Sequence, residues 1–151
     1  MGTWALESVA MLPDEIEVLA ASARHEGFRF VDRLIEDYRS GANTFAKPEE
    51  VLIAIRQNGR LVGVGGLNID PFEGSVNVGR LRRLYVDPNF RGRGVGRALV
   101  RALETIAVQH FCTLRLFTDD HDAARFYRSL GYAAVSSDAN ASHQKLFTDR
   151  P

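Results

Sequence analysis

Cysteine is almost missing from this sequence, which has one, Cys112, among 151 residues. A single cysteine excludes an intrachain disulfide framework and a cysteine-based zinc site. Between a predicted helix and a predicted strand, Cys112 is expected to be buried as a small apolar residue. No run approaches the roughly 18 apolar residues of a membrane span, and the N-terminus does not resemble a signal peptide. We therefore expect no membrane association and a reducing, cytoplasmic location.

Net charge is also missing, because 19 Lys and Arg balance 19 Asp and Glu. A balanced chain argues against a protein devoted to nucleic acid or to an anionic membrane surface. The charges are nevertheless segregated: between Arg80 and Arg101, seven arginines accompany one acid, Asp87, which gives this segment +6. The segregation predicts a local site for an anion.

Internal repeats, low-complexity tracts and linker-like stretches are absent as well. The composition, 45% hydrophobic and 25% charged, is typical of a globular protein, and the length suits one domain rather than two. We therefore expect a single domain over residues 1–151, stabilised by its own core.

The first half of the chain predicts helices followed by antiparallel strands. Asn58-Gly59 supplies the positive φ angles of a tight hairpin turn, and Pro88 ends a long strand because it lacks an amide hydrogen. The elements expected here are a strand within 4–11, a helix opening at 13–15, a helix over 30–40, and strands over 51–56, 61–69 and 78–87.

The second half alternates strands and helices. Leu99, Leu103 and Ile106 belong to an apolar stripe from residue 96 onward, with Arg101 and Glu104 on the opposite, polar face. A strand over 113–118, a helix over 122–130 and a strand over 132–137 are expected to follow. This alternation predicts parallel pairing through a crossover, hence a mixed α/β fold.

The chemistry is concentrated in a glycine-rich turn between the long strand and the next helix. Gly92, Gly94 and Gly96 allow a ligand to approach the backbone, and the helix that follows offers free amides and a positive dipole end. The turn is not a nucleotide-triphosphate loop, since the chain has no Gly-Lys pair, and its glycine spacing is not that of a dinucleotide-binding turn.

Residues 91–96, Arg-Gly-Arg-Gly-Val-Gly, resemble the Q/R-x-x-G-x-G/A signature of the GNAT superfamily of N-acetyltransferases. Residues 123–132, Ala-Ala-Arg-Phe-Tyr-Arg-Ser-Leu-Gly-Tyr, resemble the A-x-x-F-Y-x-x-x-G-F/Y segment of the same family. The resemblance implies a GNAT fold, in which a mixed sheet of six to seven strands, flanked by about four helices, splays open between the fourth and fifth strands.

The resemblance also implies acetyl-CoA as co-substrate. Backbone groups near Leu84, Tyr85 and Val86 would pair with the pantetheine arm. The pyrophosphate would lie on the turn formed by Arg91, Gly92, Arg93, Gly94, Val95, Gly96 and Arg97. Asp120 occupies a position where relatives often bind pantetheine with an asparagine, although an ionised aspartate accepts hydrogen bonds without donating them. As an acid before a helix, Asp120 also suits an N-cap, and no metal site is predicted.

For catalysis, the resemblance gives Tyr127 the role of proton donor to the departing thiolate, with a core aromatic as the alternative interpretation. Many relatives carry a glutamate at the start of the fourth strand, but this chain has Arg80 and its neighbours there. The candidate bases are Glu73, Asp70, or a water chain.

We expect an N-acetyltransferase that transfers acetyl to a primary amine of a small molecule or peptide within a ternary complex. A non-catalytic acyl-CoA-binding module is the alternative. Acceptor specificity should come from residues 14–40 and 70–77, and relatives of this kind often form homodimers through their C-terminal strands, here around 132–148.

Overall fold

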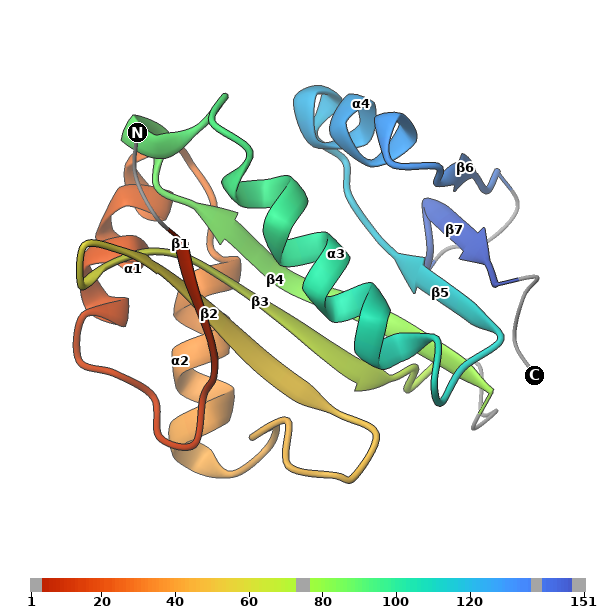
Figure 1. The fold of residues 1–151 in the computed structure, drawn as a ribbon, viewed down its shortest axis with the longest axis horizontal. Coiled ribbons are helices and arrows are strands. Elements are labelled where there is room, and N and C mark those ends of the chain that lie inside the picture. The colour runs from red at the N-terminus through yellow and green to blue at the C-terminus, as the bar shows by residue number, and fades with distance from the viewer. Residues whose placement is uncertain (1–3, 73–76, 137–139, 148–151) are drawn as a thin grey trace.

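The computed structural model describes residues 4–72, 77–136 and 140–147 (Figure 1). Strands and helices follow one another in the order β1 (Trp4–Ser8), α1 (Ile16–His25), α2 (Phe30–Ser40), β2 (Val51–Gln57), β3 (Arg60–Ile69), β4 (Val78–Val86), the 3-10 turn η1 (Pro88–Phe90), α3 (Val95–Ala107), β5 (Thr113–Leu116), α4 (His121–Ser129), β6 (Ala133–Ala134) and β7 (His143–Leu146).

The strands of this described part form one seven-stranded sheet in the order β1-β2-β3-β4-β5-β7-β6. Every neighbouring pair is antiparallel except β4 and β5, which are parallel and are joined through α3. The prediction of a mixed sheet of six to seven strands with about four helices is confirmed.

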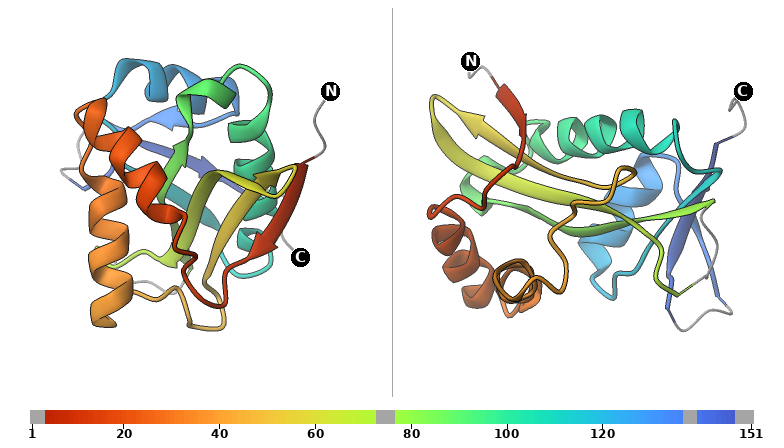
Figure 2. Two further views of the ribbon diagram at one scale, coloured as in Figure 1. Left: turned by 90° about the vertical axis from the view of Figure 1, so that its left-hand side faces the viewer. Right: turned by 90° about the horizontal axis from the view of Figure 1, so that it is seen from below.

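The sheet separates two hydrophobic layers. Helices α1 and α2 cover one face and α3 covers the other (Figure 2). Buried side chains of α3 and of the central strands make up the first core cluster, which includes Leu99, Leu103, Phe111 and Leu114. The second joins α1 and α2 to the opposite face of the sheet through Ile16, Leu19, Leu34, Leu52 and Tyr85. Strand β4 thereby lies between two packed layers, with Leu81 and Val86 in the first cluster and Tyr85 in the second.

Local sequence signals account for several element ends. Asn58 and Gly59, with φ of 52° and 81°, form the predicted tight turn between β2 and β3. Helix α2 ends where Gly41 adopts a left-handed φ of 85°.

Several predicted strands are shorter than expected. β1 ends at Ser8 instead of residue 11, since its pairing with β2 ends at Ser8 and Ile53. β5 ends at Leu116 instead of residue 118. The strand predicted over 132–137 is reduced to Ala133–Ala134, whose small exposed side chains bury little surface, and β7 lies between it and β5.

Two predictions about burial were wrong. Glu104 was placed on the polar face of α3 but is buried, because Tyr132 and Lys145 cover it; the Tyr132 hydroxyl donates to its carboxylate at 2.8 Å and the Lys145 ammonium does so at 3.0 Å. Cys112 is exposed, because it precedes β5 outside the packed layers. The sequence pattern around a residue cannot show whether a distant segment of the chain covers its side chain.

Candidate active site

Strand β4 is paired unequally on its two sides. It pairs with β3 from residue 79 to residue 86, whereas β5 pairs with it only at Val78, Gly79 and Arg80. Beyond Leu116 the chain turns away from β4 toward α4 (Figure 1). Among the described residues, the edge of β4 from 81 to 86 therefore has no strand partner, which confirms the predicted opening between the fourth and fifth strands. Such an edge presents backbone groups that an extended ligand can pair with.

A β-bulge lies within this open part of β4. The register with β3 shifts so that Arg83 and Leu84 both oppose Gly65, and Arg83 adopts a φ of 60°, which is unusual for a residue with a side chain. A Cβ atom on Gly65 would lie 2.6 Å from Cδ1 of Leu84, so any side chain there would displace the Leu84 side chain. The bulge changes the alternation of side chains along the strand, as bulges beside active sites commonly do.

The glycine-rich turn follows β4 directly. The Asp87 carboxylate accepts a hydrogen bond from the Asn89 amide at 2.9 Å and starts η1. Gly92 and Gly94 then adopt φ of 74° and 88°, and a Cβ atom on either would have no heavy atom within 4 Å. The turn is therefore open to a ligand on the side where side chains would stand.

Helix α3 begins at this turn without a side-chain cap and without an acid in its first turn. The backbone amides of Val95, Gly96 and Arg97 form no hydrogen bond in the described part of the chain, since the first helical bond there is from Ala98 to Gly94. Free amides at the positive end of a 13-residue helix form an anion-binding feature.

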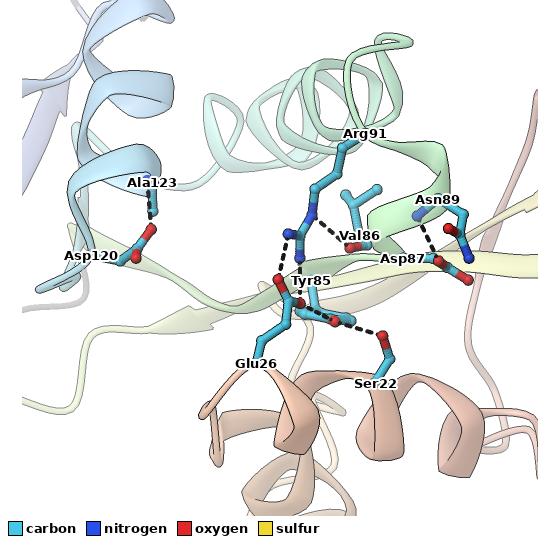
Figure 3. A network of polar contacts seen from close by, with 9 residues as sticks. All are labelled: Ser22, Glu26, Tyr85, Val86, Asp87, Asn89, Arg91, Asp120 and Ala123. Carbon is cyan, nitrogen blue, oxygen red and sulfur yellow. Dashed lines mark hydrogen bonds and ion pairs between the residues drawn. The ribbon is translucent and has the colours of Figure 1, made fainter.

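Arg91 has a different environment from the one expected of a phosphate ligand. Its guanidinium donates to both carboxylate oxygens of Glu26, at 2.7 and 2.8 Å, and to the carbonyl oxygen of Val86 at 3.1 Å. It also lies over the ring of Tyr85, 5.3 Å from the centroid (Figure 3). Arg91 therefore connects the end of β4 to the end of α1.

The acid Glu26 is shared by two partners. The hydrogen bond from Arg91 holds the pKa of Glu26 below its usual value, and the Tyr85 hydroxyl is 2.5 Å from the same carboxylate. Burial, together with the adjoining Glu26, raises the pKa of Tyr85 to about 12. The Tyr85 hydroxyl also contacts the Ser22 hydroxyl at 3.0 Å (Figure 3). Glu26 is thus ionised and Tyr85 protonated near neutral pH.

Arg93 and Arg97, the two other arginines of the turn, are exposed. The guanidinium of Arg93 lies 5.4 Å from the centroid of the Phe90 ring. Neither arginine forms an ion pair with any residue that the structure describes. Both are free to bind an anion at the turn.

Helix α4 carries two of the predicted site residues. Asp120 is its N-cap, where one carboxylate oxygen accepts a hydrogen bond from the Ala123 amide at 2.9 Å (Figure 3). Tyr127 is buried between the rings of Phe126 and Tyr132. Burial raises the pKa of Tyr127, and its hydroxyl has no hydrogen-bond partner in the described ranges. Tyr127 is therefore a protonated phenol with an unused donor.

The candidate bases have unequal surroundings. Glu73 lies outside the described residues. Asp70 follows the end of β3, where an acid is usually solvated, but its side chain is fully buried, because Arg80 lies 3.6 Å away and the Phe72 amide donates to it at 3.0 Å. Arg80, which stands where many GNAT proteins have glutamate, is itself buried and donates to the backbone oxygen of Asn140.

Comparison with known proteins agrees with this geometry. The profile of the acetyltransferase (GNAT) family matches residues 16–132, which include the open strand edge, the glycine-rich turn and α4. The chain belongs to the GNAT acetyltransferase family. This GNAT chain is 35% identical over 94 residues to the N-alpha-acetyltransferase RimI of Mycobacterium tuberculosis, an alignment that covers 60% of the chain and 56% of that relative. The chain thus spans little more than half the length of the curated relatives it matches.

Solved structures match the GNAT chain along almost its whole length. A crystal structure from Exiguobacterium sp. 255-15 has a TM-score of 0.85 at 25% identity and covers 95% of this chain and 93% of its own. The PaiA N-acetyltransferase of Thermoplasma acidophilum, solved with coenzyme A, has a TM-score of 0.67 at 18% identity, covering 95% of this chain and 99% of its own. The second match, at that identity, shows the fold alone.

No sequence pattern indicated Glu26 as a member of this GNAT site. It follows α1, 65 positions before Arg91, and no motif links the two. Within the described part of the chain, no cluster of three or more His, Cys, Asp or Glu residues is arranged to hold a metal ion. No described helix has both the length and the apolar character needed to cross a membrane.

Proposed function

We propose that this protein is an acetyl-CoA-dependent N-acetyltransferase that acetylates a primary amine by direct attack within a ternary complex. The observation that carries the proposal is the continuity of the open edge of β4 with the uncapped turn that begins α3. The open edge of β4 can form backbone hydrogen bonds with an extended ligand. The turn can donate amide hydrogen bonds to an anion at the end of that ligand. Pantetheine and pyrophosphate are joined in that order in CoA.

The residues present fit such a co-substrate. Backbone groups of Leu84, Tyr85 and Val86 are proposed to pair with pantetheine. The amides from Arg91 to Arg97, with the side chains of Arg93 and Arg97, are proposed to bind the pyrophosphate. Hydrogen bonds to charged groups stabilise by about 1.5 to 3 kcal/mol each, so several of them outweigh the helix-dipole contribution of about 0.3 to 1 kcal/mol. Asp120, already the N-cap of α4, keeps one carboxylate oxygen to accept from a pantetheine amide.

In the transfer, the amine nitrogen attacks the thioester carbonyl carbon. The new C–N bond forms, the C–S bond breaks, and its electron pair goes to sulfur, which takes a proton as the nitrogen loses one. An alkylammonium with a pKa near 10.4 is only about one part in a thousand neutral at pH 7, so a proton acceptor is needed. Holding the two reactants together supplies up to about 7 to 11 kcal/mol in favourable cases.

Tyr127 is the proposed proton donor to the sulfur. Its raised pKa keeps the phenol protonated, and its hydroxyl is not engaged by another described residue. Glu73, directly or through water, is the proposed acceptor of the amine proton. The engagement of Asp70 by Arg80 and by the Phe72 amide supports Glu73 or a water chain over Asp70.

The proposal is tested by calorimetry with CoA and by thiol release from acetyl-CoA with a panel of primary amines. Saturable CoA binding and acetylation of at least one amine are expected. Absence of CoA binding would refute the proposal. CoA binding without transfer to any amine would favour a non-catalytic acyl-CoA-binding module, for which the arginine in place of a β4 glutamate is the supporting observation.

A further inference from the structure

A pocket of about 460 Å³ lies beside β4, away from the glycine-rich turn. Its walls are the connection between α2 and β2, the end of β3 with the residues that follow it, and one side chain of β4, that of Arg82. This volume is in the range of pockets that bind small molecules. None of the residues that line it belongs to the proposed CoA site.

The acids of this pocket are already bound to other groups of the protein. Glu50 accepts hydrogen bonds from the Asn68 side chain and the Ile69 amide, both at 3.0 Å. Asp70 is engaged by Arg80 and by a backbone amide. Glu50 is therefore held in place by neutral donors, and the charge of Asp70 is balanced by Arg80.

The cations of the pocket are not engaged in this way. Arg82 is half-buried, Lys47 is exposed, and neither side chain forms a hydrogen bond or an ion pair with any residue described in the structure. A guanidinium presents a planar set of donors that matches a carboxylate or a phosphate, and it is seldom left half-buried without a partner. Arg82 is thus a cation ready to bind an anionic group.

The neighbourhood of Arg82 strengthens this positive character. Arg83 lies 3.6 Å from Asp37, its ion-pair partner on α2. Burial, with repulsion from Arg82 and Arg33, nevertheless lowers the pKa of Arg83. A second cation brought here, such as a polyamine, would meet the same repulsion, whereas an anion would relieve it.

The pocket also adjoins the place where transfer is proposed to occur. Arg82 lies within the unpaired segment of β4 and immediately before the bulge at Arg83 and Leu84. A molecule held by Arg82 is therefore anchored two residues from Leu84, the first of the backbone positions proposed for pantetheine.

We propose that the acceptor amine carries an anionic group, a carboxylate or a phosphate, and that Arg82 binds this group in the pocket as a specificity-determining residue. The inference rests on the proposed acetyltransferase function, of which it names the substrate class. It predicts discrimination against amines that carry only positive charge.

The test uses pairs of amines that differ in the anionic group: β-alanine against propylamine for the carboxylate, and phosphoethanolamine against ethanolamine for the phosphate. Spermidine serves as the cationic amine. Thiol release measures kcat and KM for the wild type, Arg82→Gln, Arg82→Lys and a control, Arg125→Gln, whose arginine is exposed on α4. Calorimetry measures binding of the same amines without turnover.

At least one anionic member should exceed its partner in kcat/KM by about tenfold or more, through KM, and spermidine should be a poor acceptor. Arg82→Gln should remove this preference, Arg82→Lys should retain part of it, and Arg125→Gln should retain it fully, while KM for acetyl-CoA is unchanged in all three. The pair with the larger ratio of kcat/KM then shows whether the site prefers a carboxylate or a phosphate.

Equal use of both members of each pair, a preference for spermidine, or an unchanged preference in Arg82→Gln would overturn the inference. The calorimetric arm separates this failure from failure of the proposed function. Binding of an anionic amine that depends on Arg82, without any acetyl transfer, would refute the enzymatic proposal and retain the anion site. Absence of such binding would overturn the anion site whether or not other amines are acetylated.

Discussion

The carboxylate of Glu26 and the guanidinium of Arg91 form a two-bond ion pair, at 2.7 and 2.8 Å, between the end of α1 and the glycine-rich turn after β4. The pair engages an arginine that the family signature assigns to the pyrophosphate site. For its side chain to reach a phosphate, Arg91 must first leave Glu26. The ion pair therefore opposes phosphate binding by this side chain, which favours the backbone amides of the turn as the primary ligands in the proposed pyrophosphate site.

Replacement of Glu26 by Gln should strengthen CoA binding. The neutral amide binds Arg91 less tightly, and a partly exposed ion pair contributes about 0.2 to 1 kcal/mol, so Kd for CoA should fall by up to about fivefold. Calorimetry measures the change, with Glu15→Gln, which alters the distant ion pair with Arg56, as the control. Weaker CoA binding in Glu26→Gln would mean that Glu26 orders the turn instead of competing for Arg91.

The same pair predicts a pH dependence of stability. Because Arg91 lowers the pKa of Glu26 below its usual value of about 4.5, the stabilisation is complete above pH 4.5 and is lost as pH falls through the lower, folded-state pKa. Wild type should therefore be more stable than Glu26→Gln at about pH 7, by less than about 1 kcal/mol, and the difference should shrink toward about pH 3. Denaturant unfolding at both pH values measures it. A difference that grows on acidification would contradict the assignment.

Replacement of Gly94 by Ala should weaken CoA binding beyond its effect on stability. The left-handed φ of 88° costs a residue with a Cβ atom about 1 to 2 kcal/mol, and the added methyl group stands on the open side of the turn. Gly59→Ala is the matched control, since Gly59 has a φ of 81° and equally open surroundings in the β2–β3 turn. Both variants should lose similar stability in denaturant unfolding, but only Gly94→Ala should raise Kd for CoA. Equal Kd in the two variants would exclude the turn from the binding site.

Replacement of Tyr127 by Phe should lower kcat by at least about tenfold and leave Kd for CoA and stability nearly unchanged. Its hydroxyl has no partner among the described residues, so the fold loses no hydrogen bond there. Tyr132→Phe is the reverse case: it removes the hydrogen bond to buried Glu104 and should cost about 1 to 3 kcal/mol of stability. Steady-state kinetics and denaturant unfolding of both variants test the contrast. Unchanged turnover in Tyr127→Phe would leave Tyr127 as a core aromatic.

A side chain at Gly66 should destabilise the protein unless Phe45 is replaced by a smaller residue. A Cβ atom on Gly66 would lie 2.3 Å from Cε1 of the buried Phe45 ring, so Gly66→Ala should destabilise the protein by about 1 to 3 kcal/mol. Adding Phe45→Leu should recover part of that loss, and a double-mutant cycle in denaturant unfolding measures the coupling. Strictly additive effects would show that the ring moves aside.

The turn and its strand were predictable because their signals are local. The position of the glycine-rich turn, the end of β4 before Pro88 and the start of α3 all follow from neighbouring residues. Glu104 was misplaced because periodicity along α3 cannot register Lys145, 41 positions away, which covers it. The two-residue β6 was overestimated for a related reason, since a strand's length depends on the partner it pairs with.

The sequence by itself determined the family, the order of strands and helices as far as the strand after α4, and the position of the glycine-rich turn, because each depends on residues close together in the chain. Only the tertiary structure decided which charged side chains are paired within the protein and which remain available to bind a ligand. It joined Arg91 to Glu26 and Asp70 to Arg80, and it left Arg82 without an ionic partner among the described residues. Ion pairing depends on distances between segments brought together by packing, and no local pattern records those distances.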